Sequence, residues 1–453
     1  MCGIDGMFAP SENVVSFLPF GLVALQHRGQ EGAGLSWSDG EYIITYKDFG
    51  LVREVLNARR LQGQEGFIGI GQVRYSTTGR HENWQNLQPI SSGYSTIAHN
   101  GNLVNSEQLR KILIKKGVEF NSTTDTEIIA NQIHRLGRNI RERIIEGMNK
   151  YFIGAYSVLT LTRTKLIAFR DPWGFRPLSI GQTSEGYYVI ASETCALDKM
   201  KARFWRDVMP GEMIVINEDG FEGKIVTPPR KPSFCIFEAV YFSRPDSLLM
   251  NGSLEVGEMR KRAGRFLAQN DDIEADAVIG VPDSGIYYAL GYQEASGIKY
   301  DELVVKDPFS IRIFIQPEER GKESKLKWNP RVSVSGKRLV VVDDSIVRGI
   351  NSKQFINQLW ERGAKEVHYR VGSAPIRYPC FYGIDTANRK ELIAANLSIK
   401  EIEKYLKVTT LKYLPFEEMV ASTGHKADEF CLACFDGHYP TPVPKERNKH
   451  LFD

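Results

Sequence analysis

A cysteine stands second in the chain, directly after the initiator methionine. If Met1 is removed, Cys2 becomes the first residue and carries both a thiol and a free α-amino group. A thiolate is a strong nucleophile, and an α-amino group with a pKa of about 8 can take the thiol proton near neutral pH. Nucleophile and base then belong to one residue, as in the N-terminal variants of the catalytic triad. The sequence therefore makes Cys2 a candidate for covalent catalysis.

Four polar, glycine-rich segments follow Cys2 in the N-terminal half, and each adjoins an apolar segment. Such segments are typical of loops that carry site residues at strand ends. They span residues 26–32, 71–79, 98–103 and 124–127. Together with the terminal cysteine, they resemble the glutaminase domain of the N-terminal-nucleophile glutamine amidotransferases.

This resemblance implies a task for each matching residue. Cys2 would attack the side-chain amide of glutamine, forming a γ-glutamyl thioester and releasing ammonia. The Asn100 side chain and the Gly101 backbone N–H would form the oxyanion hole. Arg74 would bind the α-carboxylate of glutamine, for which a planar guanidinium is well suited, and Asp125 would bind its α-amino group.

Two further positions belong with this glutamine site. Arg28 resembles a residue that positions other members of the site. Gln72 stands where the family commonly has histidine. Because glutamine can still form hydrogen bonds, we expect this change to have a small effect.

A second group of polar residues lies in the C-terminal half, where an apolar run leads into Asp343, Asp344 and Ser345. A buried strand would deliver the two carboxylates at its carboxyl end, and a loop through Arg348 and Gly349 would lead into a helix. Backbone N–H groups at a helix start suit a phosphate, and carboxylates suit ribose hydroxyls or Mg²⁺. An acidic turn without a ligand would show the same pattern.

The segment resembles the phosphoribosylpyrophosphate motif of the type I phosphoribosyltransferases, and the loop that contains Asp283 and Ser284 resembles their pyrophosphate loop. Taken together, the two halves resemble the amidophosphoribosyltransferase family from Cys2 to about Pro440. That resemblance implies that ammonia freed from glutamine travels through an internal channel to phosphoribosylpyrophosphate. There it would displace pyrophosphate and give 5-phosphoribosylamine, the first step of purine synthesis. The resemblance also implies Mg²⁺, possible purine nucleotide inhibitors, and a homo-oligomer, either a dimer or a tetramer.

Four of the six cysteines could form a ligand set. Cys431 and Cys434 form a CxxC pair, whereas Cys235 and Cys380 lie far away in the sequence. From spacing alone, a four-thiolate zinc site, an iron–sulfur cluster and unrelated buried thiols all remain open. The family resemblance implies the 4Fe-4S cluster of one branch, held by these four residues at the junction between the domains. Cys195 is expected to be buried.

The C-terminal half also departs from the family pattern. Gly285 stands where the pyrophosphate loop usually ends in a serine that contacts Mg²⁺, and residues 349–352 lack two threonines. After Lys306, the loop that closes over the substrate keeps Arg312 but lacks an arginine, a tyrosine and a glycine, and it gains a proline. These changes predict weaker phosphoribosyl transfer and poorer coupling to glutamine hydrolysis.

Two alternatives follow from these departures. The chain could be a paralogue that keeps the glutaminase and the scaffold but has lost or redirected phosphoribosyl transfer, acting as a regulatory subunit. Otherwise the C-terminal half could be a nucleotide-binding module that controls the glutaminase.

The size and composition of the chain limit the number of domains, the kinds of partner and the locations that are expected. A chain of 453 residues with 42% hydrophobic side chains can form two or three domains. The formal net charge of +3 gives no basic field for nucleic acid, and no apolar run is long enough to predict a membrane span. Six cysteines without a secretory start favour a reducing compartment, so a cytoplasmic location is expected.

The elements that must position these residues differ between the two halves. The first half predicts short strands at 42–46, 154–159 and 187–192, a helix after Asp125, and a structural turn at 171–177. Three prolines in 227–232 predict a linker. The expected domains are therefore 2–230 and 231–440, followed by a tail at 441–453.

Beyond the linker, predicted strands at 277–281 and 338–342 alternate with helices at 254–269 and after Asn351. Such alternation indicates a mostly parallel sheet. The predicted fold class is thus mixed α/β and α+β. An N-terminal-nucleophile hydrolase αββα sandwich would be followed by a type I phosphoribosyltransferase parallel-sheet domain.

Overall fold

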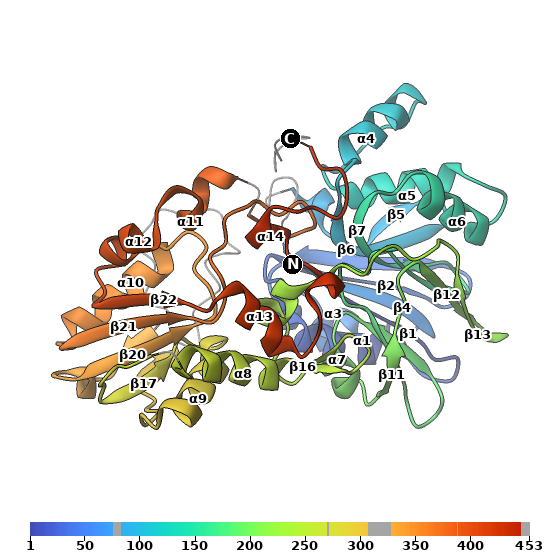
Figure 1. Ribbon diagram of the computed structural model, residues 1–453. Helices are drawn as coiled ribbons and strands as arrows, with labels where there is room; N and C mark the ends of the chain where they lie inside the picture. The colour runs from blue at the N-terminus through green and yellow to red at the C-terminus, as the bar shows by residue number, and fades with distance from the viewer. Residues whose placement is uncertain (76–82, 270, 307–327, 387, 445–453) are drawn as a thin grey trace.

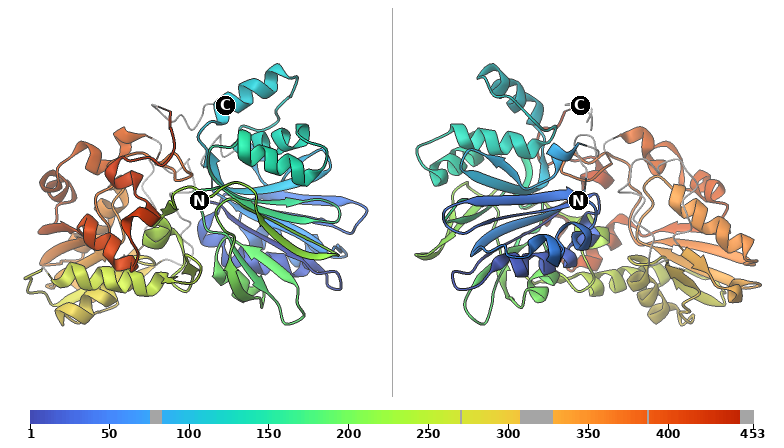
Figure 2. Two further views of the ribbon diagram at one scale, coloured as in Figure 1. Left: turned by 45° about the vertical axis from the view of Figure 1, so that its right-hand side comes forward. Right: turned by 180° about the vertical axis from the view of Figure 1, so that it is seen from behind.

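Strands rich in buried apolar residues build two antiparallel sheets in the N-terminal half of the chain. The computed structural model describes all residues except 76–82, 270, 307–327, 387 and 445–453. The N-terminal half, here the chain up to β13, lies beside the C-terminal half, which begins at β14 (Figure 1). The N-terminus lies at the junction of the two halves in every view (Figure 2).

The first sheet has seven strands in the order β11-β9-β10-β1-β4-β2-β3. All neighbouring strands are antiparallel. The strands are β1 (Gly3–Phe8), β2 (Gly32–Ser38), β3 (Ile43–Phe49), β4 (Ile68–Arg74), β9 (Ser179–Gln182), β10 (Tyr188–Ala191) and β11 (Arg203–Asp207).

The second sheet has six antiparallel strands in the order β13-β12-β8-β7-β6-β5. These are β5 (Ile90–Ser92), β6 (Ser95–Leu103), β7 (Gly154–Leu161), β8 (Leu166–Arg170), β12 (Glu212–Asn217) and β13 (Gly220–Ile225). Buried side chains such as Ile4, Ile70 and Leu159 fill the space between the two sheets.

Helices cover the outer face of each sheet. Those on the first sheet are α1 (Val14–Ala24), α2 (Val52–Val55), α3 (Ala58–Leu61) and α7 (Thr194–Lys199), and those on the second are α5 (Asp125–Arg135) and α6 (Ile140–Lys150). The preceding helix, α4 (Ser106–Lys115), projects away from the body (Figure 1). The expected αββα sandwich is therefore confirmed.

The C-terminal half is built on a parallel sheet of four strands in the order β17-β20-β21-β22. The strands are β17 (Ala277–Gly280), β20 (Arg338–Asp343), β21 (Glu366–Val371) and β22 (Thr410–Tyr413). Alternate residues of each strand face opposite sides. Val278 and Val340 pack toward α8 (Val256–Gln269) and α9 (Gly285–Ser296). Ile279 and Val341 pack toward α10 (Ile350–Glu361) and α12 (Ile399–Leu406).

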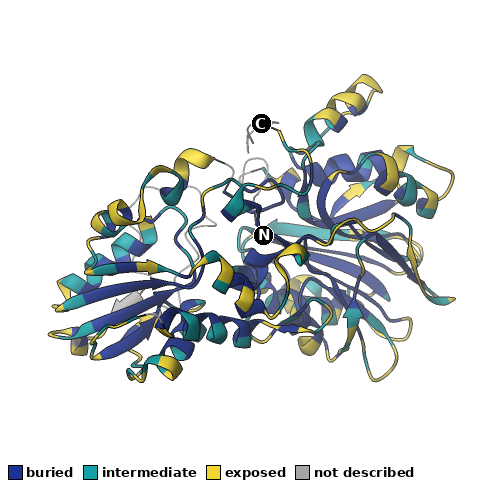
Figure 3. Ribbon diagram, in the orientation of Figure 1, coloured by how far each residue is buried: buried dark blue, intermediate teal, exposed yellow. Residues whose placement is uncertain are grey.

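Shorter elements complete the C-terminal half. They are β14 (Phe234–Cys235), the π-helical turn η3 (Glu238–Phe242), β15 (Leu248–Leu249), β16 (Leu254–Glu255), β18 (Val304–Lys306), β19 (Trp328–Pro330), α11 (Ile393–Asn396), α13 (Phe416–Thr423), β23 (Phe430–Cys431) and α14 (Ala433–Asp436). The central strands of both halves are largely buried, and exposed residues gather on the outer helices and loops (Figure 3). Within the described residues, no helix is both long enough and apolar enough to cross a membrane.

The element predictions hold with small shifts of their ends. The helix expected from residue 254 begins at Val256, because Leu254 and Glu255 form β16. Residues 227–232 lie between β13 and β14 and form neither helix nor strand. Gly363 follows α10 with a positive φ of 83°, which suits a glycine that ends a helix.

Candidate active sites

Cys2 lies where β1 begins beside the end of β4. These strands are antiparallel, so the start of one lies next to the residue that follows the other. The Sγ atom of Cys2 lies 3.5 Å from both the backbone nitrogen and the carbonyl oxygen of Tyr75. Burial raises the pKa of the Cys2 thiol, so a nearby base is needed to generate the thiolate.

Met1 is fully buried at the junction of the two halves, in an apolar cluster that includes Phe175 and Phe234. Burial lowers the pKa of its α-amino group well below the ordinary value of 8.0. Burial in this environment therefore favours the neutral form of an α-amino group, the form that can accept a proton.

Asn100 and Gly101 lie on β6, in the second sheet. Asn100 is buried, and among the described residues its Nδ2 has no hydrogen-bond partner. Leaving a buried donor unpaired costs about 1–3 kcal/mol, so this amide is suited to an acceptor that arrives with a ligand. Gly101 has a φ of +152°, and an added Cβ would lie 2.1 Å from the carbonyl oxygen of Ala155. Only glycine fits at this position.

Arg74 and Asp125 bring charge to the same region. Arg74 ends β4 and forms a buried ion pair with Glu31 at 3.3 Å. Arg74 lowers the pKa of the nearby Cys2 thiol and Glu31 raises it. Asp125 begins α5, and one of its carboxylate oxygens accepts a hydrogen bond of 2.9 Å from the backbone of Leu103, at the end of β6.

Gln72 forms a hydrogen bond, as expected. Its Nε2 donates to the carbonyl oxygen of His99 at 3.0 Å. This bond joins β4 to β6, and therefore connects the two sheets behind the site.

Arg28 ties the backbone of Cys2 to two carboxylates. Its Nε donates to the carbonyl oxygen of Cys2 at 3.0 Å. Its Nη1 pairs with Glu193, and its Nη2 lies 3.0 Å from both carboxylate oxygens of Glu238. All three side chains are fully buried. Glu238 comes from η3 in the C-terminal half, so Arg28 connects the candidate nucleophile to both halves.

Sequence reasoning missed the rest of this network. Arg176 pairs with Glu238 at 3.3 Å and donates to the carbonyl oxygen of Tyr382 at 3.0 and 2.6 Å. The turn that contains Arg176 is structural, as expected, because Asp171 accepts hydrogen bonds from the backbone of residues 173 and 175. Nothing in the sequence of the turn signals that its arginine pairs with Glu238.

The candidate phosphate site lies at the carboxyl ends of β17 and β20. The hydroxyls of Ser284 and Ser345 donate to the Asp344 carboxylate, and that of Tyr369 donates to Asp343. The serine of the predicted pyrophosphate loop therefore reaches the predicted acidic pair. Burial raises the pKa of Asp343 well above its ordinary value, and it also raises that of Asp344.

The other predicted residues of this site have different surroundings. Asp283 is exposed and follows Pro282 through a cis peptide bond. Gly349 precedes α10 with a φ of +75°, and an added Cβ would lie 2.7 Å from Ile393. Arg348 donates to Glu391 at 2.7 Å and to the carbonyl oxygen of Asp385 at 3.2 Å.

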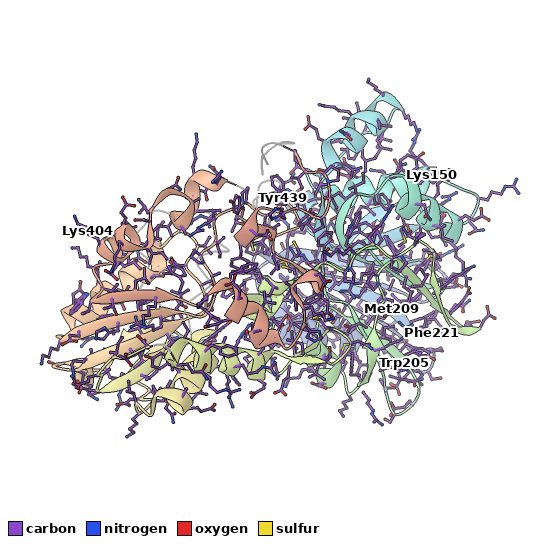
Figure 4. The ribbon with its side chains drawn as sticks, in the orientation of Figure 1. Lys150, Trp205, Met209, Phe221, Lys404 and Tyr439 are labelled. Atoms are coloured by element: carbon purple, nitrogen blue, oxygen red, sulfur yellow. The ribbon has the colours of Figure 1, made fainter. Side chains whose placement is uncertain are left out.

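Four cysteines line one cavity at the junction of the two halves. Cys235 and Cys431 lie opposite each other in the parallel pair β14–β23, and Cys380 and Cys434 complete the set. Burial raises the pKa of Cys235 to about 11 and raises that of Cys431 and Cys434 well above the ordinary value. The other lining residues are Phe175, Arg176, Tyr382, Ile384, Ala433 and Tyr439. Tyr439 lies near α14, between the halves (Figure 4).

The described residues include no group of three or more His, Cys, Asp or Glu side chains arranged to hold one metal ion. Both a single zinc ion and an iron–sulfur cluster can take four cysteine ligands. Cys195, which is neither the candidate nucleophile nor one of these four, is buried elsewhere, as expected.

Known proteins match both a part of this chain and nearly its whole length. A family model for a glutamine amidotransferase domain matches residues 73–199. The amidophosphoribosyltransferase of Methanocaldococcus jannaschii is 44% identical over 99% of this chain and 99% of its own. That of Bacillus subtilis is 42% identical over 98% of this chain and 94% of its own. The chain belongs to the amidophosphoribosyltransferase family.

A solved structure of this family has the same fold. The glutamine phosphoribosylpyrophosphate amidotransferase of B. subtilis, complexed with ADP and GMP, superposes with a TM-score of 0.90 at 41% identity. The match covers 99% of this chain and all of the other. The predicted fold class, a nucleophile-hydrolase sandwich followed by a phosphoribosyltransferase sheet, is confirmed.

Gly285 is a departure from the amidophosphoribosyltransferase pattern that the structure explains. It begins α9, and an added Cβ would lie 2.5 Å from the carbonyl oxygen of Val342 and 3.3 Å from the Cα of Asp343. A serine would therefore force α9 away from β20. Glycine allows the helix to approach the strand that carries the acidic pair.

The closing loop expected of an amidophosphoribosyltransferase is described only at its start. Lys306 ends β18, but its side chain lies outside the described residues, and so does the whole of Arg312. Both remain predictions.

Proposed function

We propose that this amidophosphoribosyltransferase hydrolyses glutamine at Cys2 and uses the ammonia to convert phosphoribosylpyrophosphate to 5-phosphoribosylamine. The observation that carries the proposal is the unpaired amide of Asn100, buried on β6 in the same half as a buried N-terminal cysteine. Glutamate formation by purified protein tests the first step. Loss of Met1, seen in the intact mass, tests whether Cys2 becomes the first residue.

The first reaction uses groups of the N-terminal half. The α-amino group of Cys2 takes the thiol proton, and the thiolate attacks the amide carbon of glutamine. The Asn100 amide and the Gly101 N–H stabilise the oxyanion. When the tetrahedral species collapses, the carbon–nitrogen bond breaks and the amino group returns its proton to the departing ammonia. Water then hydrolyses the thioester to glutamate.

Recognition of glutamine depends on its charged α-carboxylate and α-amino groups. Arg74 would bind the α-carboxylate, exchanging at least part of its ion pair with Glu31 for the ligand. Asp125 would accept hydrogen bonds from the α-amino group. Its attachment to the end of β6 fixes the distance between substrate recognition and the oxyanion hole.

The second reaction takes place at the acidic pair. Asp343 and Asp344 would bind the ribose hydroxyls or hold Mg²⁺, which would neutralise charge on the departing pyrophosphate. The backbone N–H groups after Gly349 and the hydroxyls of Ser284 and Ser345 would bind phosphate oxygens. Ammonia attacks C1, the bond to pyrophosphate breaks, and the new amine loses a proton.

A paralogue without transferase activity would keep the first reaction only. The contact of Ser284 with Asp344 favours an assembled phosphate site. The altered closing loop still predicts slower transfer and poorer coupling than is usual in the family. The ratio of glutamate formed to pyrophosphate released measures that coupling, and ammonia-dependent release of pyrophosphate separates a slow transferase from one that is lost.

We also propose that Cys235, Cys380, Cys431 and Cys434 hold a 4Fe-4S cluster. Four thiols around one cavity with an otherwise mainly apolar lining fit such a group, and Arg176 among the lining residues would balance its negative charge. The cluster would join the C-terminal end of the chain to the domain junction. Protein purified without oxygen should contain about four iron and four sulfide per chain. Stoichiometric zinc, or stable protein without metal, would refute this assignment.

We make three further proposals, on the domain bounds, the inhibitors and the cellular location of the protein. We propose domains at 2–230 and 231–440 with a tail at 441–453, which limited proteolysis can test. Purine nucleotides are proposed inhibitors, since the B. subtilis relative was solved with ADP and GMP. We propose a cytoplasmic location, because none of the six cysteines, all of which are described, forms a disulfide.

A homo-oligomer is also proposed. Trp205, Met209 and Phe221 lie toward the outer edge of the N-terminal half and support this (Figure 4), and the rings of Trp205 and Phe221 are in contact. Trp205 is 52% exposed and Met209 is 45% exposed, and both residue types are enriched at surfaces that bind another protein. Sedimentation of the wild-type chain and of Trp205→Ser tests the proposal.

A further inference from the structure

A short segment of the C-terminal half, residues 381–383, lies against the N-terminal half, at and beside the strand that carries the candidate oxyanion hole. Asn102 is buried on β6, one residue after Gly101. Its Nδ2 donates a hydrogen bond of 2.9 Å to the carbonyl oxygen of Phe381. The two residues are 279 positions apart in the sequence, so this bond connects the two halves.

Gly383 makes a second contact with the same strand. An added Cβ at Gly383 would lie 3.0 Å from the carbonyl oxygen of Gly101, 3.1 Å from its carbonyl carbon and 3.3 Å from its Cα. Gly101 is itself packed against Ala155 of β7, since an added Cβ at Gly101 would lie 2.1 Å from the carbonyl oxygen of Ala155. The oxyanion-hole glycine is therefore held between its own sheet and the C-terminal half.

Tyr382 provides a third contact. Its carbonyl oxygen accepts two hydrogen bonds from the buried guanidinium of Arg176. Its ring stacks on Phe175, with ring centroids 4.2 Å apart. Three consecutive residues of the C-terminal half thus contact the N-terminal half through backbone atoms.

An oxyanion hole works only when its donors are held at the position that the developing charge will occupy. A displacement of about 1 Å can lower the rate about 100-fold. We propose that residues 381–383 hold the oxyanion hole in position, which makes Asn102 and Gly383 positioning residues for glutamine hydrolysis. The inference rests on the proposed function of Cys2. It means that the glutaminase site is complete only when the C-terminal half is docked.

Asn102→Ala and Gly383→Ala test this proposal. Each should lower kcat for glutaminase about 10- to 100-fold. The KM for glutamine should change less than about threefold, because neither residue binds the α-carboxylate or the α-amino group. Ammonia-dependent release of pyrophosphate should persist, because that reaction does not use the oxyanion hole.

Two matched variants control for general damage. Asn105→Ala removes an amide that donates to Tyr151 at 2.7 Å, within the N-terminal half. Gly424→Ala replaces a glycine with a φ of +77°, where an added Cβ would meet only the guanidinium of Arg262, at 3.8 and 3.9 Å. Both variants should keep the wild-type kcat for glutaminase.

The outcomes distinguish failure of the positioning role from failure of the proposed function. If folded Asn102→Ala protein keeps the wild-type kcat, or if only its KM rises, the positioning role is refuted. Asn102→Ala decides the matter even if Gly383→Ala does not fold, because Asn102 has ordinary strand geometry. A wild-type chain without glutaminase activity would instead refute the proposed function on which the inference rests.

Discussion

The Nε of Arg28 donates a hydrogen bond of 3.0 Å to the carbonyl oxygen of Cys2. The same guanidinium binds Glu238 from the C-terminal half. A carboxylate of the phosphoribosyltransferase-like half is therefore separated from the candidate nucleophile by one arginine. This chain of contacts joins the two halves through buried side chains.

Glu238→Gln should destabilise the protein strongly. Glu238 is fully buried between Arg28 and Arg176. Removing its charge leaves Glu193, which pairs with Arg28, as the remaining carboxylate in the described network. Removing one partner of a buried ion pair costs about 3–5 kcal/mol. Denaturant unfolding of the variant measures the loss.

The control for Glu238→Gln is Glu222→Gln. Glu222 pairs with Arg141 on the surface, where its side chain is 59% exposed. Exposed pairs contribute about 0–1 kcal/mol, so this variant should unfold like the wild type. Equal effects of the two substitutions would contradict the assigned importance of the buried network.

Asn100→Ala should remove an oxyanion donor. Loss of one such donor lowers kcat by about 100- to 1000-fold, and KM for glutamine should change little because Asn100 does not bind the main-chain charges of the substrate. Steady-state glutaminase kinetics measure both constants. A variant with wild-type kcat would show that the unpaired amide of Asn100 has another purpose.

Asp5→Asn should stabilise the protein at neutral pH. Asp5 is fully buried on β1, and within the described residues neither carboxylate oxygen has a hydrogen-bond partner. Burial raises its pKa well above the ordinary value of 3.8. The folded state therefore binds the proton more tightly than the unfolded state does, and Asp5 lowers stability as the pH rises from 3.8 through the folded pKa.

The stability gained by Asp5→Asn should thus grow with pH and vanish below the unfolded pKa. Thermal unfolding of both proteins across a pH series measures the difference. A difference that is constant with pH, or one that shrinks as the pH rises, would contradict an uncompensated carboxylate at this position.

Gly285→Ser should impair the transferase although serine is common there in the family. The added Cβ would lie 2.5 Å from the backbone oxygen of Val342, so α9 and β20 must separate. Ammonia-dependent release of pyrophosphate should fall, while glutaminase activity should persist. Gly297→Ser, at the other end of α9, places its Cβ where no atom lies within 4 Å, and it should keep transferase activity. Faster transfer by Gly285→Ser would mean that the helix can shift without harm.

The sequence predicts those site residues whose role follows from their position in the chain or from the residues next to them. Cys2 is recognisable from its position, and Asp343 and Asp344 from a buried strand that leads into a helix. Contacts such as those of Arg28 with Glu238 join residues 210 positions apart, and no periodicity or spacing encodes them. Gly285 shows a further limit. Its departure from the family pattern predicts a lost Mg²⁺ ligand, whereas the structure shows close packing of a helix on a strand.

The prediction for the closing loop after Lys306, unlike that for Gly285, is not tested by the structure. Pro308 and the missing glycine limit the backbone freedom that such a loop needs, and these residues lie outside those that the structure describes. Weaker transfer and poorer coupling therefore stay predictions.

The central claim is that ammonia from Cys2 supplies the transferase. Release of pyrophosphate from phosphoribosylpyrophosphate by Cys2→Ala tests it most directly, measured once with glutamine and once with an ammonium salt. We expect release with ammonium and none with glutamine, because the substitution removes the nucleophile and leaves the acidic pair intact. Release with glutamine at the wild-type rate, or no release with either nitrogen source while the wild type is active, would contradict the account.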